Sequence, residues 1–284
     1  MELTRSSPFR SVLGLPSLVT GEASTLLANL RRSWRILWAL TIIECRRKYA
    51  GSILGLLWYP LYSGLLLGSY CFVYLVVFRV KYRDLSTYDF VLFVFAGLIP
   101  YLGFSEAVQS GLGSVKANLA LLRNSVFPIE FVPVKHVLAA MVGLLSSLAL
   151  LLLMILPTTY RGWHMLYLPL PLLSLVIFCV GIVWVLSAVA VVVPDVAQVV
   201  NVALLLFMFV SPIGYSIEMI PPQARILVYV NPMTYLIEGF RFALIGLRQS
   251  PLWWDSVFLL AVTVFAVTAG AFFRRMSPIF SDYE

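Results

Sequence analysis

Six long apolar stretches, joined by segments of differing length and polarity, dominate the chain. They lie near residues 56–78, 90–111, 137–157, 172–193, 196–215 and 253–273. An α-helix rises about 1.5 Å per residue, so roughly twenty residues cross the ~30 Å hydrocarbon core of a bilayer. The pattern therefore predicts an all-α integral membrane protein with six transmembrane helices and with both termini on one side.

The segment before the first span is amphipathic. Between residues 24 and 49, apolar side chains recur at helical spacing, while arginines fall on another side of the same helix. This favours a helix at the membrane interface with its tryptophans at headgroup depth. Because Ile36 and Leu40 fall outside the apolar stripe, a helix packed against protein also fits. The stripe consists of Leu27, Leu30, Trp34, Leu37 and Trp38, and the basic side of Arg31, Arg32 and Arg35.

Basic residues predict the orientation of the spans. Arg46, Arg47 and Lys48 stand directly before the first span, and 13 of the 20 Lys and Arg residues fall on the side of this cluster. Such clusters are retained on the cytoplasmic side of a membrane. We therefore expect both termini to be cytoplasmic. The expected divisions are a cytoplasmic segment at 1–55, a transmembrane domain at 56–273 and a cytoplasmic tail at 274–284.

The cytoplasmic loop at 112–136 has a helical apolar face of its own. Leu112, Val115, Leu119 and Leu122 share this face, and two prolines end the pattern. The spacing predicts a short amphipathic helix within the loop. Its apolar face could dock on a partner or lie on lipid, and the sequence fits both.

The periplasmic loop at 216–250 is far less polar than an aqueous loop usually is. Three prolines cut it into pieces too short to cross a membrane. Glu238 and Arg241 stand on one helical face of the last piece, where each can neutralise the other. This indicates re-entrant helices before the last span; a helix lying flat on the outer leaflet is the alternative. The prolines are Pro221, Pro222 and Pro232.

Composition narrows the function. Of the 284 residues, 61% are hydrophobic and 12% charged, with a mean hydropathy of +0.94, which leaves too little polar surface for a soluble globule. The net charge of +7 comes from residues at membrane flanks, where anionic lipid explains it better than nucleic acid. No cleaved signal peptide is expected. The scattered Cys45, Cys71 and Cys179 and two distant histidines predict no metal site.

The predicted spans hold almost none of the groups that chemistry requires. The charged residues within them are Glu106 and Asp255, each near an end. A secondary transporter needs ionisable groups near the midplane, and a glycan-processing enzyme needs a nucleophile, a base or a metal cluster. A GxxxxGK[ST] phosphate-binding motif is also missing from the sequence. We therefore predict no catalytic residue and no cofactor on this chain, with ATP and Mg²⁺ on another subunit if nucleotide drives it.

Four tyrosines of the first span form a positive signal. Tyr59, Tyr62, Tyr70 and Tyr74 fall within about 120° of the helix circumference, at 100° per residue. Tyrosine offers a ring face for stacking and a hydroxyl for hydrogen bonds, which suits a path for sugars. An interfacial aromatic belt or core packing would use the same side chains.

Short motifs along the chain carry a family resemblance. The run RKYAGSILGLLW at 47–58 is similar to an RY-x-GS-x-LG-x-x-W pattern. Further motifs follow in order: GLIPY at 97–101, Asn118, Phe127-Pro128 with Pro133, SPIGY at 211–215, and NPMT at 231–234 with Glu238 and Arg241 after it. Together they resemble the membrane subunit of ABC-2 type polysaccharide exporters, which move O-antigen, teichoic acid and related lipid-linked glycans. The resemblance covers most of the chain after about residue 40.

The resemblance implies an assembly and two sets of functional residues. Two copies of a six-span subunit would form a channel in the bacterial inner membrane, with two ATPase subunits on its cytoplasmic face. The implied ATPase coupling contacts are Lys116, Asn118, Leu119, Leu122 and Arg123, with a minor one at Asp195, before which this chain has Pro194 where the family often has Arg. The implied re-entrant gate comprises Pro221, Pro222, Asn231, Pro232, Glu238 and Arg241.

The expected substrate is an undecaprenyl-type lipid-linked polysaccharide. Arg46, Arg47 and Lys48 could steer its pyrophosphate to the cytoplasmic entrance, because their charges suit phosphate oxygens. Anchoring of the topology alone would explain the same cluster. A drug-exporting ABC-2 permease is the nearest rival because it shares the six spans, and the tyrosine-lined face favours the glycan.

Overall fold

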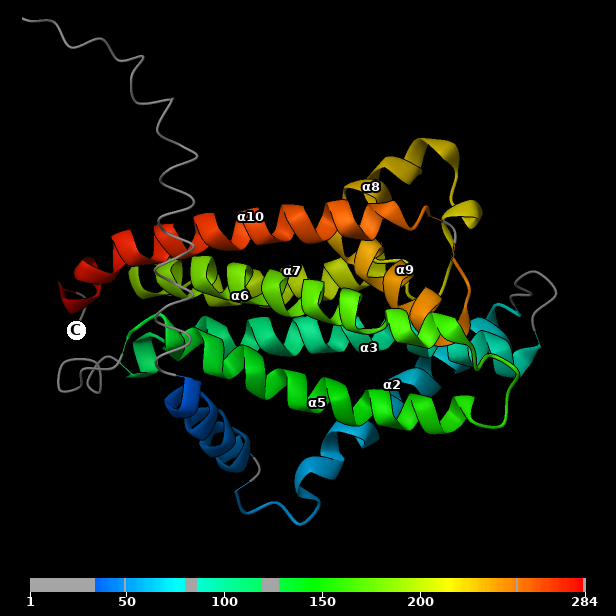
Figure 1. Ribbon diagram of the computed structural model, residues 1–284, viewed down its shortest axis with the longest axis horizontal. Helices are drawn as coiled ribbons and strands as arrows, with labels where there is room; N and C mark the ends of the chain where they lie inside the picture. The colour runs from blue at the N-terminus through cyan, green and yellow to red at the C-terminus, as the bar shows by residue number, and fades with distance from the viewer. Residues whose placement is uncertain (1–33, 49, 80–85, 119–127, 249, 283–284) are drawn as a thin grey trace, which may run out of the picture.

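The regular elements of this protein are all helical in the part of the chain that the structure describes. The computed structural model describes residues 34–282 apart from 49, 80–85, 119–127 and 249. Figure 1 shows the long helices side by side in one bundle. They are α2 (Trp58–Cys71), α3 (Thr87–Leu112), α5 (Phe131–Ile155), α6 (Pro169–Val192) and α10 (Trp253–Met276), accompanied by the shorter α7 (Val196–Val210), α8 (Arg225–Val230) and α9 (Pro232–Ile245).

Five helical stretches are long and apolar enough to cross a membrane. They are Trp58–Val77, Thr87–Leu112, Phe131–Ile155, Trp163–Val192 and Trp253–Phe280. Each coincides with a predicted span, and the first extends α2 through the π-helical segment η3 (Phe72–Val77). The span predicted at 196–215 corresponds to α7. Its 15 residues measure about 22 Å, which is shorter than a typical hydrocarbon core.

Capping residues stabilise the ends of α3 and α9. The side chain of Ser86 accepts a hydrogen bond from the backbone N–H of Asp89, and the Asp89 carboxylate accepts one from the backbone N–H of Ser86, which forms a capping box before α3. The Asn231 side chain caps α9 by accepting from the backbone N–H of Met233, and Pro232 occupies the first turn. At the other end of α9, Gly246 adopts φ +68°, a conformation that side chains disfavour.

The N-terminal helix (residues 34–48) packs on the bundle through one face. Leu37 and Thr41 are buried there, and Leu37 joins a core cluster with Phe131 and Phe273. Its opposite face exposes several large apolar side chains, namely Trp34, Trp38, Ile42 and Ile43. The interpretation as a helix packed against protein therefore describes one face of this helix. Its exposed apolar face is compatible with the interpretation as a helix at the membrane interface. The remainder of the predicted helix at 24–49 lies outside the described residues.

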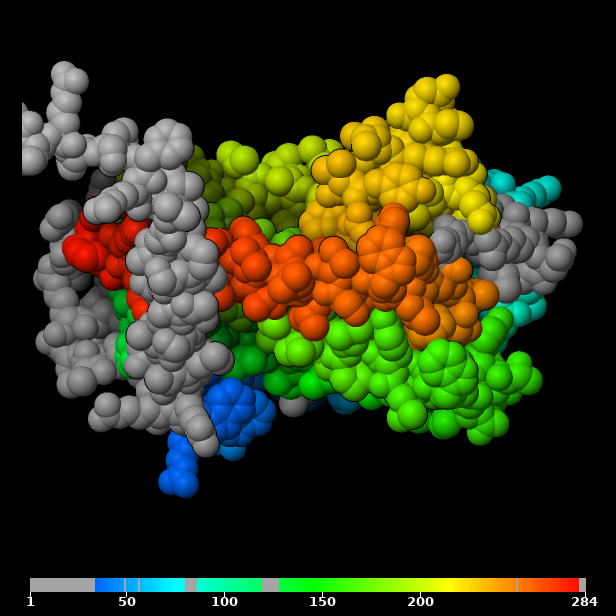
Figure 2. All heavy atoms as spheres, turned by 45° about the horizontal axis from the view of Figure 1, so that its top comes forward, coloured from blue at the N-terminus to red at the C-terminus, as the bar shows by residue number. Residues whose placement is uncertain are grey.

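The described ends of the chain lie together. Figure 1 shows helix 34–48 and the C-terminal end of α10 at the same end of the bundle, which we call the N/C end. In Figure 2, α10 runs along one face, and the segment that contains α8 projects near the opposite end.

Helix α9 is buried within the bundle. Of its 14 residues, 11 are buried, and it packs against α3, α6 and η5 (Trp163–Tyr167). A helix lying flat on a bilayer surface would expose one whole side, so that alternative is wrong for α9. Helix α8 differs, because Ile226, Leu227 and Val230 are exposed.

The predicted amphipathic helix in the loop at 112–136 is not α-helical over its described beginning. Helix α3 ends at Leu112, a turn follows, and η4 (Lys116–Asn118) is a single 3-10 turn. The C-cap at Gly113 closes α3 before the amphipathic pattern can continue it. Leu119, Leu122 and Arg123 lie outside the described residues.

Candidate functional site

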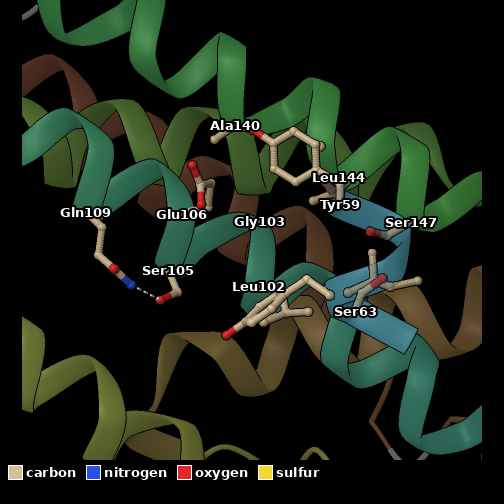
Figure 3. Close-up of a pocket in the computed structure, with 13 residues that line it drawn as sticks. Tyr59, Ser63, Leu102, Gly103, Ser105, Glu106, Gln109, Ala140, Leu144 and Ser147 are labelled. Carbon is tan, nitrogen blue, oxygen red and sulfur yellow. Dashed lines mark hydrogen bonds between the residues drawn. The ribbon is translucent and has the colours of Figure 1, made fainter. Parts of the chain in front are cut away.

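A polar cleft of about 140 Å³ opens between α2, α3 and α5 (Figure 3). Hydroxyl, amide and carboxylate groups from all three helices line it, among otherwise apolar walls. Polar groups that converge on one cavity between apolar helices are typical of a binding site or a transport path. The polar lining consists of Tyr59, Tyr62, Ser63, Ser105, Glu106, Gln109 and Ser147.

Two glycines allow the helices around this cleft to approach closely. A Cβ atom on Gly143 of α5 would lie 2.2 Å from the Tyr59 ring, and one on Gly103 of α3 would lie 2.3 Å from a methyl group of Leu144. Such separations are far below van der Waals contact, so neither position accepts a side chain without movement. In Figure 3 the Tyr59 ring and the Glu106 carboxylate extend to the same side of the cleft.

An ion pair connects the cleft to helix 34–48. The Lys48 ammonium donates to Glu106 Oε1 and lies 3.3 Å from the Tyr59 hydroxyl oxygen. The same ammonium is 5.0 Å from the centroid of the Tyr59 ring, within the range of a cation–π contact. Lys48 thereby links the N-terminal helix to α3 and α2, although 58 residues separate it from Glu106.

A second charged contact lies one helical turn earlier on the N-terminal helix. Glu44 pairs with Lys135 of α5 at 3.2 Å and approaches His136 Nδ1 to 3.8 Å. Among the described residues, His136 Nε2 has no hydrogen-bond partner. Glu44 and Lys48 are four residues apart and share one face. The helix is thus fastened to α5 by an acidic residue and to α3 by a basic one.

The structure divides the four predicted tyrosines into two pairs. Tyr59 and Tyr62 line the cleft. Tyr70 and Tyr74 lie further along the same span, where their rings stack with centroids 6.0 Å apart. Tyr74 also packs near Phe90, and a Cβ on Gly214 would meet its ring at 2.6 Å.

The basic residues before the first span and the predicted coupling residues have different surroundings. Arg46 and Arg47 are exposed on helix 34–48, whereas Lys48 reaches the cleft. Lys116 is exposed on η4. Asn118 is buried and donates to the Ser114 carbonyl at 2.7 Å, so its amide stabilises its own turn. Asp195 is exposed directly before α7.

Arg241 is the centre of the predicted gate segment. Its side chain is 1% exposed and donates to the carbonyls of Pro212 and Ile213, each at 2.7 Å. Its guanidinium lies 3.5 Å from the centroid of the Phe93 ring of α3. The predicted partner Glu238 is also buried, at 3.4 Å. Arg241 therefore joins α9, α3 and the segment after α7.

The other gate residues differ in burial. The Asn231 amide donates to Ser211 Oγ at 3.0 Å while its carbonyl oxygen caps α9. Pro232 follows in the first turn of α9 and is partly buried. Pro221 and Pro222 begin the 3-10 turn η7 (Pro222–Ala224) and are exposed.

A third charged cluster supports α9 and α10 at the end opposite the N/C end. Arg248 contacts both carboxylate oxygens of Asp255, at 2.6 and 2.9 Å, and Tyr167 donates to the same carboxylate at 2.8 Å. Burial is the largest single effect and lowers the pKa of Arg248, but the contacts with Asp255 and Tyr167 together raise it by more, so the net shift is upward. This cluster fixes a charged guanidinium where a lone charge would be costly.

Sequence reasoning missed several residues of these sites. Glu44, Glu106, Lys135 and His136 were not assigned a role, nor were the serines of the cleft. One signal was available, because Glu106 is a carboxylate inside an otherwise apolar span, and such residues are costly unless they are used. The other partners depend on helix packing and leave no local signal.

The described residues also bear on metals and thiols. They contain no group of three or more His, Cys, Asp or Glu side chains that could hold a metal ion. Cys45, Cys71 and Cys179 are all free thiols. Burial, with a smaller contribution from Glu44, raises the pKa of Cys45, which disfavours the reactive thiolate.

Comparison with known proteins gives a consistent result. The family described as ABC-2 type transporter matches residues 35–245. The chain is 27% identical over 219 residues to the O-antigen export system permease protein RfbA of Myxococcus xanthus, covering 76% of this chain and 82% of that protein. It is 24% identical over 218 residues to the RfbA permease of Klebsiella pneumoniae, covering 75% and 81%. It is 26% identical over 208 residues to the polysialic acid transport protein KpsM of Escherichia coli, covering 72% and 79%.

Proposed function

Because this chain belongs to the ABC-2 type transporter family, we propose that it is the channel-forming subunit of an ATP-driven exporter of lipid-linked polysaccharide. It is a multi-pass membrane subunit, and the family supplies no catalytic domain or cofactor on it. The proposed location is the bacterial inner membrane, with the N/C end in the cytoplasm. ATP and Mg²⁺ would bind to a separate ATPase subunit.

The observation that carries this proposal is the extent of the likeness to polysaccharide export permeases. The match to the Myxococcus xanthus protein spans about three quarters of this chain and most of the relative. The Escherichia coli relative is named for another glycan, polysialic acid. The shared property is therefore transport of a long glycan, and O-antigen-like polysaccharide is the substrate class that we propose.

A pair of chains is the proposed transport unit. Only 11% of the residues in the most apolar stretch of the first span, Trp58–Val77, are buried, so this span has surface left for lipid or for a second copy. Tyr62 is 58% exposed beside the cleft. Two such spans facing each other would line a path with tyrosine rings, on which sugars stack and form transient hydrogen bonds.

The proposed mechanism begins at the ATPase. ATP binding would draw the two ATPase copies together and push on the N/C end, where Lys116 and Asp195 are exposed and where Leu119, Leu122 and Arg123 are expected. This push would tilt α2 away from α7 and open a continuous path. In this proposal, α7 with the segment after it completes a sixth crossing, and α8 and α9 form the re-entrant gate.

Reconstitution tests the proposal. The protein and its ATPase are placed in inverted membrane vesicles with an undecaprenyl-linked polysaccharide, and glycan that becomes protected in the lumen is measured. We expect transfer with ATP and none with a non-hydrolysable analogue. Vesicles that contain the ATPase alone are the matched control. ATP-dependent uptake of a small hydrophobic drug without any glycan transfer would refute the proposal and favour a drug efflux permease.

A further inference from the structure

We propose that Glu106 is an internal anion that occupies Lys48 until a diphosphate lipid headgroup displaces it, so that Glu106 keeps weakly binding lipid phosphates out of the cleft. This inference rests on the proposed function and adds a residue that sets the binding strength a substrate needs. The Lys48 ammonium contacts two residues of the cleft, because it is held by the Glu106 carboxylate beside the Tyr59 hydroxyl. Glu106 is itself a lining residue of the cleft.

The Lys48–Glu106 pair is exposed enough for Lys48 to exchange one partner for another. The two side chains are 38% and 31% exposed, whereas those of the neighbouring Glu44–Lys135 pair are 14% and 10% exposed. A partly exposed ion pair in contact with water contributes little net free energy to the stability of the fold. Breaking a buried pair strands a charge at a much larger cost. Glu44 and Lys135 therefore anchor helix 34–48, while Lys48 can change its partner.

The groups beside Lys48 suit phosphate oxygens. The Tyr59 hydroxyl stands 3.3 Å from the Lys48 ammonium, and hydroxyl and ammonium groups are common donors to phosphate. Ser147 also lines the cleft, whereas the Ser63 hydroxyl already donates to the Pro60 carbonyl of its own helix at 3.1 Å. Among the described residues, Glu106 is the one carboxylate that lines the cleft. When a diphosphate takes the place of Glu106 at Lys48, the ammonium and the Tyr59 hydroxyl are the donors that it meets.

The charge of the competing anion decides whether exchange is favourable. Bulk phospholipids offer phosphodiesters with a single negative charge, which is the charge of the Glu106 carboxylate, so replacing one by the other gains little. A diphosphate diester carries a charge on each phosphate and interacts more strongly with the same ammonium. A bare basic cluster at a membrane surface would be covered by abundant anionic lipid. Glu106 prevents this while it admits the diphosphate.

The helix that carries Lys48 supports a lipid as the source of the phosphate. Trp34 and Trp38 stack with ring centroids 6.2 Å apart, and both are about half exposed on the face away from the bundle. Tryptophan is enriched at headgroup depth. Lys48 lies on the same helix, three turns further on. A headgroup at that depth can reach the cleft while its chains remain in the bilayer.

Binding to the full chain in phosphatidylcholine nanodiscs tests the inference without the ATPase. The two probes are radiolabelled undecaprenyl pyrophosphate and phosphatidylglycerol. We expect Glu106→Gln to strengthen the binding of both lipids by roughly fivefold, the value of a partly exposed ion pair, because loss of the internal competitor frees Lys48 for either anion. Phosphatidylglycerol, at a concentration that leaves the unaltered chain mostly empty, should therefore occupy the variant. Glu130→Gln removes the same charge at the same end of the bundle, outside the cleft, and should leave both affinities unchanged.

A second variant keeps the test decisive if Glu106→Gln folds poorly. Lys48→Gln should weaken binding of undecaprenyl pyrophosphate, and thermal unfolding of each variant is measured in parallel. The inference is overturned if Glu106→Gln weakens or preserves the binding of both lipids, or if Lys48→Gln binds the diphosphate as well as the unaltered chain. These outcomes are independent of export. Stronger lipid binding by Glu106→Gln without ATP-dependent glycan transfer would refute the proposed function and leave this inference standing.

Discussion

Replacing Arg241 with methionine should strongly destabilise the protein. Methionine fills a similar volume but removes two hydrogen bonds to carbonyls, each at 2.7 Å, and leaves Glu238 buried at 3% exposure. Stranding one partner of a buried ion pair costs about 3–5 kcal/mol. Each buried carbonyl that loses its donor adds about 1 kcal/mol. The expected loss for Arg241→Met is therefore about 5–7 kcal/mol in the free energy of unfolding.

A double variant separates these two contributions. Adding Glu238→Leu to Arg241→Met removes the stranded carboxylate, so only the carbonyl cost of about 2 kcal/mol should remain. Arg225→Met is the control, because Arg225 donates to one carbonyl, that of Ile220 at 3.1 Å, and is only partly buried. It should lose about 1 kcal/mol.

Denaturant titration measures the effect. Purified protein in mild detergent micelles is unfolded with sodium dodecyl sulfate and followed by far-ultraviolet circular dichroism. The reasoning is refuted if Arg241→Met unfolds within about 1 kcal/mol of the unaltered protein, below the stranded-charge cost. It is refuted equally if the double variant is as unstable as the single one, because the buried carboxylate would then contribute nothing.

Two further substitutions test the cleft and the start of α9. Gly143→Ala should lower the melting temperature, with a loss of about 1–3 kcal/mol in the free energy of unfolding, because its Cβ would lie 2.2 Å from the Tyr59 ring. The control Gly64→Ala, whose Cβ would meet no atom within 4 Å, should show no such loss. Equal melting temperatures for the two variants would contradict the close approach. Asn231→Ala should cost about 1 kcal/mol of unfolding free energy through the lost helix cap, and a variant as stable as the parent would show that the cap is dispensable.

The sequence predicted the long helices well because span length is a local property. A run of about twenty apolar residues is recognisable without any knowledge of its neighbours, and the five long spans follow such runs. Helix α7 was less predictable. The apolar run at 196–215 continues past its last helical residue, Val210, into bends that include Pro212, and hydropathy does not register the loss of helical geometry.

The sites were predictable only where their partners are close in sequence. Glu238 and Arg241 stand three residues apart, so helical spacing alone paired them. The shorter contacts of Arg241, to Pro212 and Ile213, join residues 29 and 28 positions away and depend on the fold. For the same reason, the sequence did not distinguish Lys48 from its neighbours Arg46 and Arg47. The packing of the helices places Lys48 against Glu106.

The two fastenings of helix 34–48 should respond differently to electrolyte. Mobile ions screen charges that contact water over about 8 Å at physiological ionic strength and act far less on charges enclosed by protein. Raising the salt concentration should therefore loosen the Lys48 contact while the Glu44 contacts one turn earlier, whose partners are nearly dry, remain in place. Ionic strength thus becomes a means of releasing the last turn of this helix from α3 without altering a residue.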